Sequence, residues 1–279
     1  MTKREMPPII YGTAWKKQRT YDLVRQAYST GFRGFDTACQ PRHYAEALVG
    51  DALASLANEG VVRESYYLQT KYTPISGQDP DTVPYDSHAL VYDQVLESFE
   101  VSLTNLQTDY LDAYILHSPF KAFEKTVEAW RAMESLYDQG KIGQLGISNC
   151  YQLEVLQNLY EISVVKPSIV QNRFYDETGY DIELRRWCRE HDITNQSFWT
   201  LTANPHLLMH TLLIQLSEKY DKSPAQVLFN YLRHSNVTPL TGTKNPAHMA
   251  LDLDSFDVEF PANELAQIDS LLVEFATPI

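Results

Sequence analysis

Four polar residues in the first 117 positions have side chains that one proton-transfer reaction would use. They are Asp36 in the segment GFDTA, Tyr44 in PRHYAE, Lys71 in YLQTK and His117 in YILHSP. Asp36, Lys71 and His117 each end a short apolar or β-branched run that is typical of a strand. The ends of parallel strands meet at one rim of a barrel, so we expect these side chains to lie close together.

The four residue types favour reduction of a carbonyl group. A buried carboxylate or ammonium is costly unless paired, so Asp36 and Lys71 are expected to form an ion pair that faces a cavity. The ammonium beside Tyr44 would lower the pKa of the phenol from its usual value of about 10 and make it a usable general acid. His117 would orient a carbonyl oxygen or relay a proton, and its neutral ring would donate from one nitrogen only.

Repeated strand-helix units would position these residues. Short apolar runs alternate with longer stretches of helical periodicity, and the alternation occurs eight times. Strands are expected within IIYGT, GFDTA, SYYLQTK, YLDAYILH, IGQLGIS, SIVQN, ITNQSFW and VTPLTG. The clearest helical patterns cover residues 90–106, 123–137 and 262–274, and breaks fall at Gly31, Gly140, Pro167 and Pro261.

Eight such units can close as a barrel or spread as a doubly wound sheet. A dinucleotide-binding sheet needs GxGxxG directly after its first strand, but the glycines of GKIGQLG precede a strand. We therefore predict an α/β fold, a single (β/α)8 barrel domain over residues 1–279, with the active site at the carboxyl ends of the strands.

Composition argues against several classes of partner. The formal net charge is −13 and no concentrated basic run occurs, which disfavours nucleic acids and anionic membranes. No segment approaches the roughly 20 apolar residues of a membrane span, and MTKREMPPIIYG lacks a signal-peptide stretch. The three cysteines are widely spaced and form no metal-ligand motif. We expect an unprocessed cytoplasmic protein without a metal, either a monomer or a weak homo-oligomer.

Several motifs then follow one another in the order of a known family. GFDTA with a following Tyr and Glu, LQTK, LHSP, LGISN and IVQN together resemble the aldo-keto reductases, from about Ile9 to the last barrel helix. The resemblance implies that Tyr44 is the proton donor, that Asp36 and Lys71 activate it, and that His117 orients the carbonyl of the substrate. Hydride would pass directly from the nicotinamide C4 to the carbonyl carbon of an aldehyde or ketone.

The resemblance also implies a nicotinamide cofactor, with NADPH favoured and NADH as the alternative. Ser148, Asn149 and Gln171 match positions that hydrogen-bond the carboxamide, and Phe198 matches an aromatic that stacks on the nicotinamide ring. The other positions matched to cofactor contacts are Thr200, Leu201, Gly242, Thr243, Lys244 and His248.

The chain departs from the family pattern in three places, and two of them concern the proton donor and the nucleotide. Tyr44 lies three residues later than usual, so a loop insertion is assumed, and His43 or another tyrosine remains an alternative donor. In GTKNPAHMALD, Gly242 stands where the family carries a lysine and His248 where it carries an arginine. The fixed guanidinium for a 2′-phosphate is thus missing, and Lys244 would compensate as a point charge.

The substrate pocket is expected to be accessible and lined by aromatic rings. A serine follows His117 where the family often has tryptophan, and the chain stops soon after its last helix. The predicted substrate-binding residues are Trp15, Tyr72, Ser118, Phe120 and Trp199, with the segment GQDPDTVPYD as a mobile wall.

Structural roles compete with these assignments. Asp36 alone would be explained as a helix cap, His117 as a core histidine, and Ser148-Asn149 as the cap of a helix that begins near Tyr151. Two other functions also compete: a cofactor-binding regulatory protein of the same fold with little turnover, and a barrel hydrolase or isomerase without nicotinamide. The complete set of four residues favours the reductase, because neither a metal cluster nor a carboxylate pair is apparent.

Overall fold

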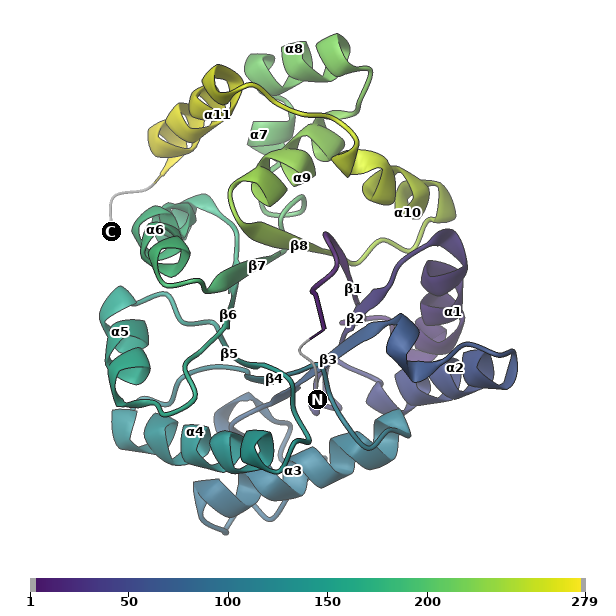
Figure 1. Cartoon of the computed structure of the whole chain (residues 1–279), viewed down its shortest axis with the longest axis vertical. Coiled ribbons are helices and arrows are strands. Elements are labelled where there is room, and N and C mark those ends of the chain that lie inside the picture. The colour runs from purple at the N-terminus through teal and green to yellow at the C-terminus, as the bar shows by residue number, and fades with distance from the viewer. Residues whose placement is uncertain (1–3, 277–279) are drawn as a thin grey trace.

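The computed structural model describes residues 4–276, and these contain a closed barrel of parallel strands (Figure 1). Strand β1 closes the barrel by pairing with β8, where Ile10 is in register with Leu240. The strands are β1 (Ile10–Gly12), β2 (Gly34–Asp36), β3 (Tyr67–Tyr72), β4 (Ala113–Leu116), β5 (Leu145–Ser148), β6 (Ile169–Arg173), β7 (Thr194–Phe198) and β8 (Val237–Thr241). The predicted (β/α)8 fold is confirmed, and each predicted segment corresponds to one strand, although β3 and β6 extend one residue beyond theirs.

Helices surround the barrel, and each helix of the three clearest sequence patterns differs from its predicted bounds by one residue at one end only. Gly31 ends the first helix with a φ of 129°, a conformation that glycine adopts without strain. The helices are α1 (Thr20–Thr30), α2 (Glu46–Asn58), α3 (Val91–Leu106), α4 (Phe123–Asp138), α5 (Leu153–Ile162), α6 (Ile182–Glu190), α7 (Pro205–Leu208), α8 (Thr211–Tyr220), α9 (Pro224–His234), α10 (Pro246–Leu253) and α11 (Ala262–Phe275).

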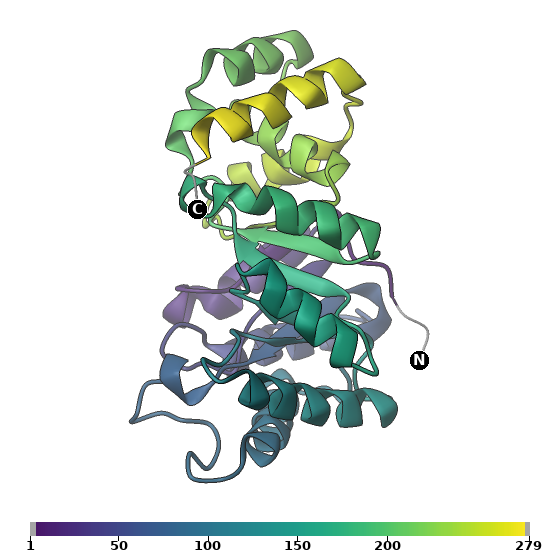
Figure 2. The same cartoon turned by 90° about the vertical axis from the view of Figure 1, so that its left-hand side faces the viewer.

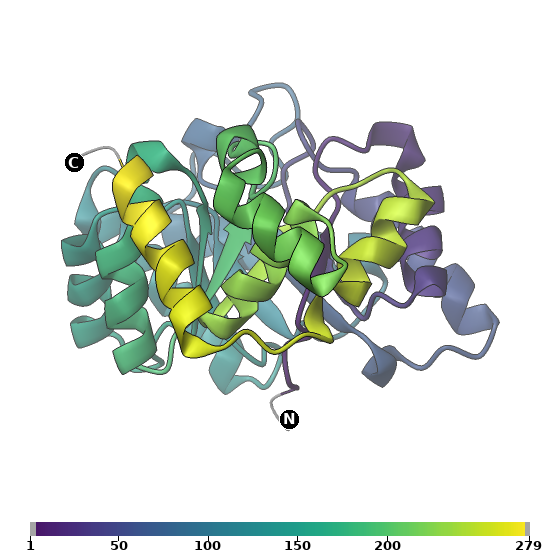
Figure 3. The ribbon, with the colours of Figure 1, turned by 90° about the horizontal axis from the view of Figure 1, so that it is seen from above.

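The two ends of the barrel differ in what covers them. The chain enters at the amino ends of the strands, and the long segment between β3 and α3 projects from the opposite end (Figures 2 and 3). Three helices, α7, α8 and α9, lie between β7 and β8. Because all eight strands are parallel, the loops that follow them lie together at one end of the barrel. Enzymes of this fold bind substrates at that end.

Strand β3 shows how alternation separates the interior of the barrel from the helical layer. Gln69 and Lys71 face inward, and both reach the carboxylate of Asp36. Tyr72 faces outward, and its hydroxyl donates to Oε1 of Gln94 on α3 at 3.0 Å. The apolar core fills the layer between strands and helices, whereas polar side chains, among them Gln69 and Lys71, occupy the interior of the barrel around Asp36.

Candidate functional site

Asp36 and Lys71 form a buried ion pair at the floor of the site. Lys71 Nζ lies 2.6 Å from Asp36 Oδ1 and 2.7 Å from the backbone oxygen of Thr37. The side-chain amides of Gln69 and Gln171 donate to the same carboxylate oxygen at 2.7 and 3.0 Å. Burial lowers the pKa of Lys71, and the Asp36 carboxylate opposes that shift. The predicted ion pair is confirmed.

Tyr44 reaches this pair from the loop between β2 and α2. A tight turn absorbs the extra residues of the loop, because the amide of Tyr44 donates to the backbone oxygen of Gln40 at 3.0 Å. The centroid of the Tyr44 ring then lies 5.2 Å from Lys71 Nζ and 6.1 Å from the centroid of the His117 ring. The unusual spacing of Tyr44 in the sequence is therefore compatible with a place beside Lys71 and His117.

The environment of Tyr44 raises the pKa of its phenol, first through burial and then through the Asp36 carboxylate. The prediction that this pKa is lowered is wrong, because burial of the phenol raises it and the Asp36 carboxylate raises it further. Tyr44 is accordingly protonated at neutral pH. His43, the alternative donor, packs against Trp15, with ring centroids 3.9 Å apart and the ring planes tilted by 35°.

His117 follows β4 directly and is held from both sides. Its backbone amide donates to the oxygen of Tyr72 at 2.8 Å, and its Nδ1 lies 2.6 Å from Oγ1 of Thr73. Burial lowers the pKa of the imidazole well below its ordinary value, and the positive charge of Lys71 adds to the effect. The ring is therefore neutral at pH 7, with Nδ1 engaged by Thr73.

The three residues matched to the carboxamide differ in their surroundings. Gln171 and Asn149 line the cavity, whereas Ser148 is buried behind it and donates to the backbone oxygen of Gln171 at 2.6 Å. The nitrogen of Gln171 donates within the floor network, which leaves Oε1 as its acceptor. Helix α5 begins at Leu153 without a side-chain cap, so the interpretation of Ser148-Asn149 as its cap is wrong.

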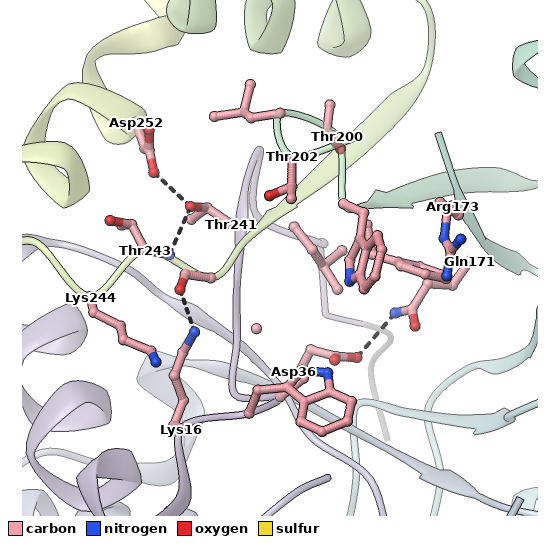
Figure 4. Close-up of a pocket in the computed structure, with 18 of the residues that line it drawn as sticks. Lys16, Asp36, Gln171, Arg173, Thr200, Thr202, Thr241, Thr243, Lys244 and Asp252 are labelled. Atoms are coloured by element: carbon pink, nitrogen blue, oxygen red, sulfur yellow. Dashed lines mark hydrogen bonds between the residues drawn. The ribbon is translucent and has the colours of Figure 1, made fainter. Parts of the chain in front are cut away.

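Two lysines converge at the other end of the site (Figure 4). Lys16 Nζ donates to the backbone oxygen of Gly242. Burial lowers the pKa of Lys16 to about 8, and the charges of Lys244 and Arg19 contribute. Within residues 4–276 no carboxylate forms an ion pair with either Lys16 or Lys244.

A cavity of about 840 Å³ joins the ion pair to this cationic end. The predicted cofactor residues on its wall are Asn149, Gln171, Phe198, Thr200, Leu201, Gly242, Thr243, Lys244 and His248. Two of the predicted substrate residues, Trp15 and Trp199, also line it, and they are 52% and 48% exposed. Both tryptophans have left-handed backbones, with φ of 61° and 58°, a strained conformation for a bulky residue.

Three predicted substrate residues do not line the cavity. Tyr72 is fully buried against α3, because it follows the inward-facing Lys71 and must point outward. Phe120 packs against the core, and its amide donates to Oγ1 of Thr126 on α4. Neither Ser118 nor the segment at residues 77–86 contributes to the cavity wall.

Several lining residues were not predicted from the sequence. Lys16 follows β1, and Arg173 ends β6 two positions after Gln171. Strand alternation would have identified Arg173, since residues two apart face the same side. Lys16 belongs to the pair Lys16-Lys17, and the sequence alone does not show which of the two side chains enters the cavity.

Other classes of site find little support in residues 4–276. No group of three or more His, Cys, Asp or Glu there is arranged to hold a metal ion. None of the described helices has the length and apolar character needed to cross a membrane. Cys39, Cys150 and Cys188 are buried and unpaired, and burial raises the pKa of each thiol to about 12.

Comparison with known proteins agrees with this geometry. Residues 8–201 match the model of the aldo/keto reductase family. The chain is 32% identical over 252 residues to glyoxal reductase of Bacillus subtilis, covering 90% of this chain and 82% of the relative. It is 30% identical over 285 residues to the NADPH-dependent alpha-keto amide reductase of Saccharomyces cerevisiae, covering 94% and 85%. A crystal structure of an aldo-keto reductase enzyme from a Medee basin deep-sea metagenome library superposes with a TM-score of 0.82 at 26% identity, over 97% of this chain and 93% of that one.

Proposed function

The chain belongs to the aldo/keto reductase family, and from this premise we propose that it reduces small aldehydes and ketones to alcohols with NADPH as its preferred cofactor. One observation carries the proposal. The cavity that contains Tyr44, His117 and the Asp36 carboxylate continues without interruption to the cationic end at Lys16 and Lys244. A carbonyl group and a phosphorylated cofactor therefore fit into one space.

The residues on the wall suit a nicotinamide dinucleotide. When bound, the cofactor supplies a hydride to the carbonyl carbon of the substrate. Phe198 offers a ring for stacking, and Oε1 of Gln171 offers an acceptor for the carboxamide. Burial lowers the pKa of Lys16, and the nearby charge of Lys244 adds to the shift, so an anion between the two lysines would be stabilising.

Tyr44 is the proton donor of this mechanism. Its phenol is protonated at neutral pH because burial raises its pKa, so the proton is available for the carbonyl oxygen as that oxygen gains charge. The phenolate that remains faces the ammonium of Lys71, whose Nζ lies 5.2 Å from the ring centroid. Asp36 holds the ammonium in place through the 2.6 Å contact.

His117 orients the substrate. We assign the hydroxyl of Thr73 as the donor to Nδ1, which leaves the single proton of the neutral ring on Nε2. That N–H would hydrogen-bond the carbonyl oxygen and direct it toward Tyr44. The neutral ring positions the oxygen without competing with Tyr44 as an acid, since a charged imidazolium is disfavoured by burial and by Lys71.

The cationic end favours NADPH over NADH. Lys16 and Lys244 are two positive charges without a carboxylate partner in the part of the chain that the structure describes, and a 2′-phosphate would add an anion that NADH lacks. We place the enzyme in the cytoplasm, as a monomer or weak homo-oligomer, and the unpaired cysteines support a reducing compartment.

The test is cofactor consumption with NADPH and with NADH across aromatic and aliphatic aldehydes and ketones. Tyr44→Phe should lower kcat by about 10²–10⁴-fold and leave nucleotide binding nearly unchanged. Tyr137→Phe, on the outer face of α4 and 38% exposed, is the matched control and should keep full activity. Retained turnover in Tyr44→Phe would show that another group donates the proton.

A further inference from the structure

The guanidinium of Arg173 lines the cavity and has neither a hydrogen-bond acceptor nor a carboxylate partner on its wall. It is half-buried, yet within residues 4–276 its guanidinium forms no ion pair or hydrogen bond, and its Nε is buried without an acceptor. The other half-buried arginines of the described chain all donate to a carboxylate or a backbone oxygen: Arg4, Arg25, Arg63, Arg131 and Arg185. A desolvated donor group without an acceptor is costly, so an acceptor from outside the chain is the simplest explanation.

Two aromatic rings hold this guanidinium in place. Its Cζ lies 4.2 Å from the centroid of the Trp199 ring and 5.0 Å from that of Tyr175. Stacking covers the faces of a guanidinium and leaves its N–H edge as the donor surface. The strained backbone of Trp199, with φ of 58°, places its ring against Arg173. The group is therefore preorganised for a planar anion.

Arg173 lies away from Lys16 and Lys244, the end of the cavity to which we assign the cofactor phosphates. Arg173 ends β6, two residues beyond Gln171, which is about 7 Å along a strand. Gln171 in turn contacts Asp36 on the floor. Figure 4 shows Arg173 beside Gln171, on the opposite side of the cavity from Lys16 and Lys244. An anion on Arg173 would thus lie close to the reacting groups.

The two acidic residues of the cavity wall contact other side chains and do not pair with Arg173. Asp36 is bound by Lys71, and the carboxylate of Asp252 accepts from Oγ1 of Thr241 at 2.7 Å. The ligand must then supply the negative charge. A carboxylate matches the guanidinium edge in shape and can accept two parallel N–H bonds.

We propose that Arg173 is a substrate-binding residue and that the preferred substrates are carbonyl compounds that also carry a carboxylate, such as aldehyde acids and oxo acids. The inference rests on the proposed function, since the carbonyl group must lie at Tyr44 and His117 while the carboxylate reaches Arg173. It narrows that function to a class of anionic substrates.

Two aldehydes that differ only in this group provide the test. 4-Formylbenzoate carries the carboxylate, and 4-formylbenzamide is its neutral isostere. The wild-type enzyme should show kcat/KM at least tenfold higher for the benzoate. Arg173→Gln should remove that preference with little change for the benzamide, and Arg173→Lys should retain part of it, because lysine keeps the charge but not the bidentate edge. Arg186→Gln removes the same charge from the exposed face of α6 and should change neither value.

Calorimetry with the oxidised cofactor separates binding from turnover. With NADP⁺ no hydride is available, so 4-formylbenzoate should bind the wild type at least tenfold more tightly than Arg173→Gln, even if the proposed reductase activity fails. Equal binding by both proteins would overturn the inference. Weaker NADP⁺ binding by Arg173→Gln, with equal losses for the two aldehydes, would also overturn it and would assign Arg173 to the cofactor phosphates. A wild-type enzyme that reduces both aldehydes equally would overturn the inference and leave the proposed function intact.

Discussion

Lys16 should make nucleotide binding depend on pH above neutrality. In the free protein its pKa is lowered from 10.5 to about 8, first by burial and then by Lys244 and Arg19. A phosphate beside the ammonium would return the pKa toward its ordinary value. Binding should therefore take up a proton wherever Lys16 is neutral in the free protein, and affinity should fall as the pH rises through 8.

The size of the effect follows from the two pKa values. In the free protein Lys16 is about 90% protonated at pH 7 and about 10% at pH 9, whereas in the complex it stays charged at both. The Kd for NADP⁺ should therefore rise about tenfold between pH 7 and pH 9. Two groups near Lys16 do not titrate in this window, because burial raises the pKa of Asp252 only to about 6 and raises that of Tyr11 far above 9. The phosphate ester itself has its second pKa at about 6.

Isothermal titration calorimetry at pH 7, 8 and 9 and constant ionic strength measures this effect directly. At pH 8, two buffers with different ionisation enthalpies should report the uptake of about half a proton. Lys16→Gln should bind NADP⁺ more weakly at pH 7 and show little further loss at pH 9. Lys17→Gln, an exposed neighbour that removes the same charge, is the control and should behave as the wild type. A wild-type Kd that is flat across the three pH values would refute the reasoning, as would equal losses in the two variants.

Three further substitutions have definite expected outcomes. Asp36→Asn leaves the buried ammonium of Lys71 without its carboxylate and should lower the free energy of unfolding by about 3–5 kcal/mol. Urea denaturation measures this change. An unchanged midpoint would contradict the argument that an unpaired charge at this buried position is costly. Thr73→Val removes the contact to Nδ1 of His117 and should lower kcat about fivefold with little change in KM, whereas Thr73→Ser should retain activity; equal rates would mean that the contact does not orient the ring. Gly50→Ala should destabilise the protein by about 1–3 kcal/mol, because the added Cβ would lie 1.9 Å from a backbone oxygen of α3. This clash should outweigh the better helix propensity of alanine. Thermal denaturation measures the effect, and a raised melting temperature would show that α2 and α3 can move apart.

The fold and the floor of the site follow from local patterns in the sequence. Apolar runs of strand length separated by amphipathic stretches predict the eight units, and Asp36 and Lys71 at strand ends predict their ion pair. Both predictions depend on which face a residue occupies and on the cost of a buried charge. The same alternation argues against Tyr72 as a pocket residue, because Lys71 cannot face inward unless its neighbour faces outward.

Other features depend on contacts between distant segments and could not be predicted from local pattern. The raised pKa of Tyr44 results from burial of the phenol and from the nearby Asp36 carboxylate, and both depend on the three-dimensional fold. Family resemblance assigns Ser148 to the cofactor, but its hydroxyl donates to the backbone of β6 behind the cavity wall. The approach of Lys16 to Gly242 joins residues that are 226 positions apart.

The paired charges on the floor of the barrel also affect how this sequence can change over time. Losing the acid alone leaves a buried cation, and losing the base alone leaves a buried anion, so either single step passes through a poorly stable intermediate. Losing both together to apolar residues of similar volume is often neutral or stabilising, by about 1–4 kcal/mol. Laboratory evolution that selects only for heat resistance would therefore favour inactive double mutants. Recombination would have to introduce both replacements in one step. When mutations arise one at a time, the loss of stability in each single mutant selects against change at either position. This epistasis preserves the ion pair that catalysis requires.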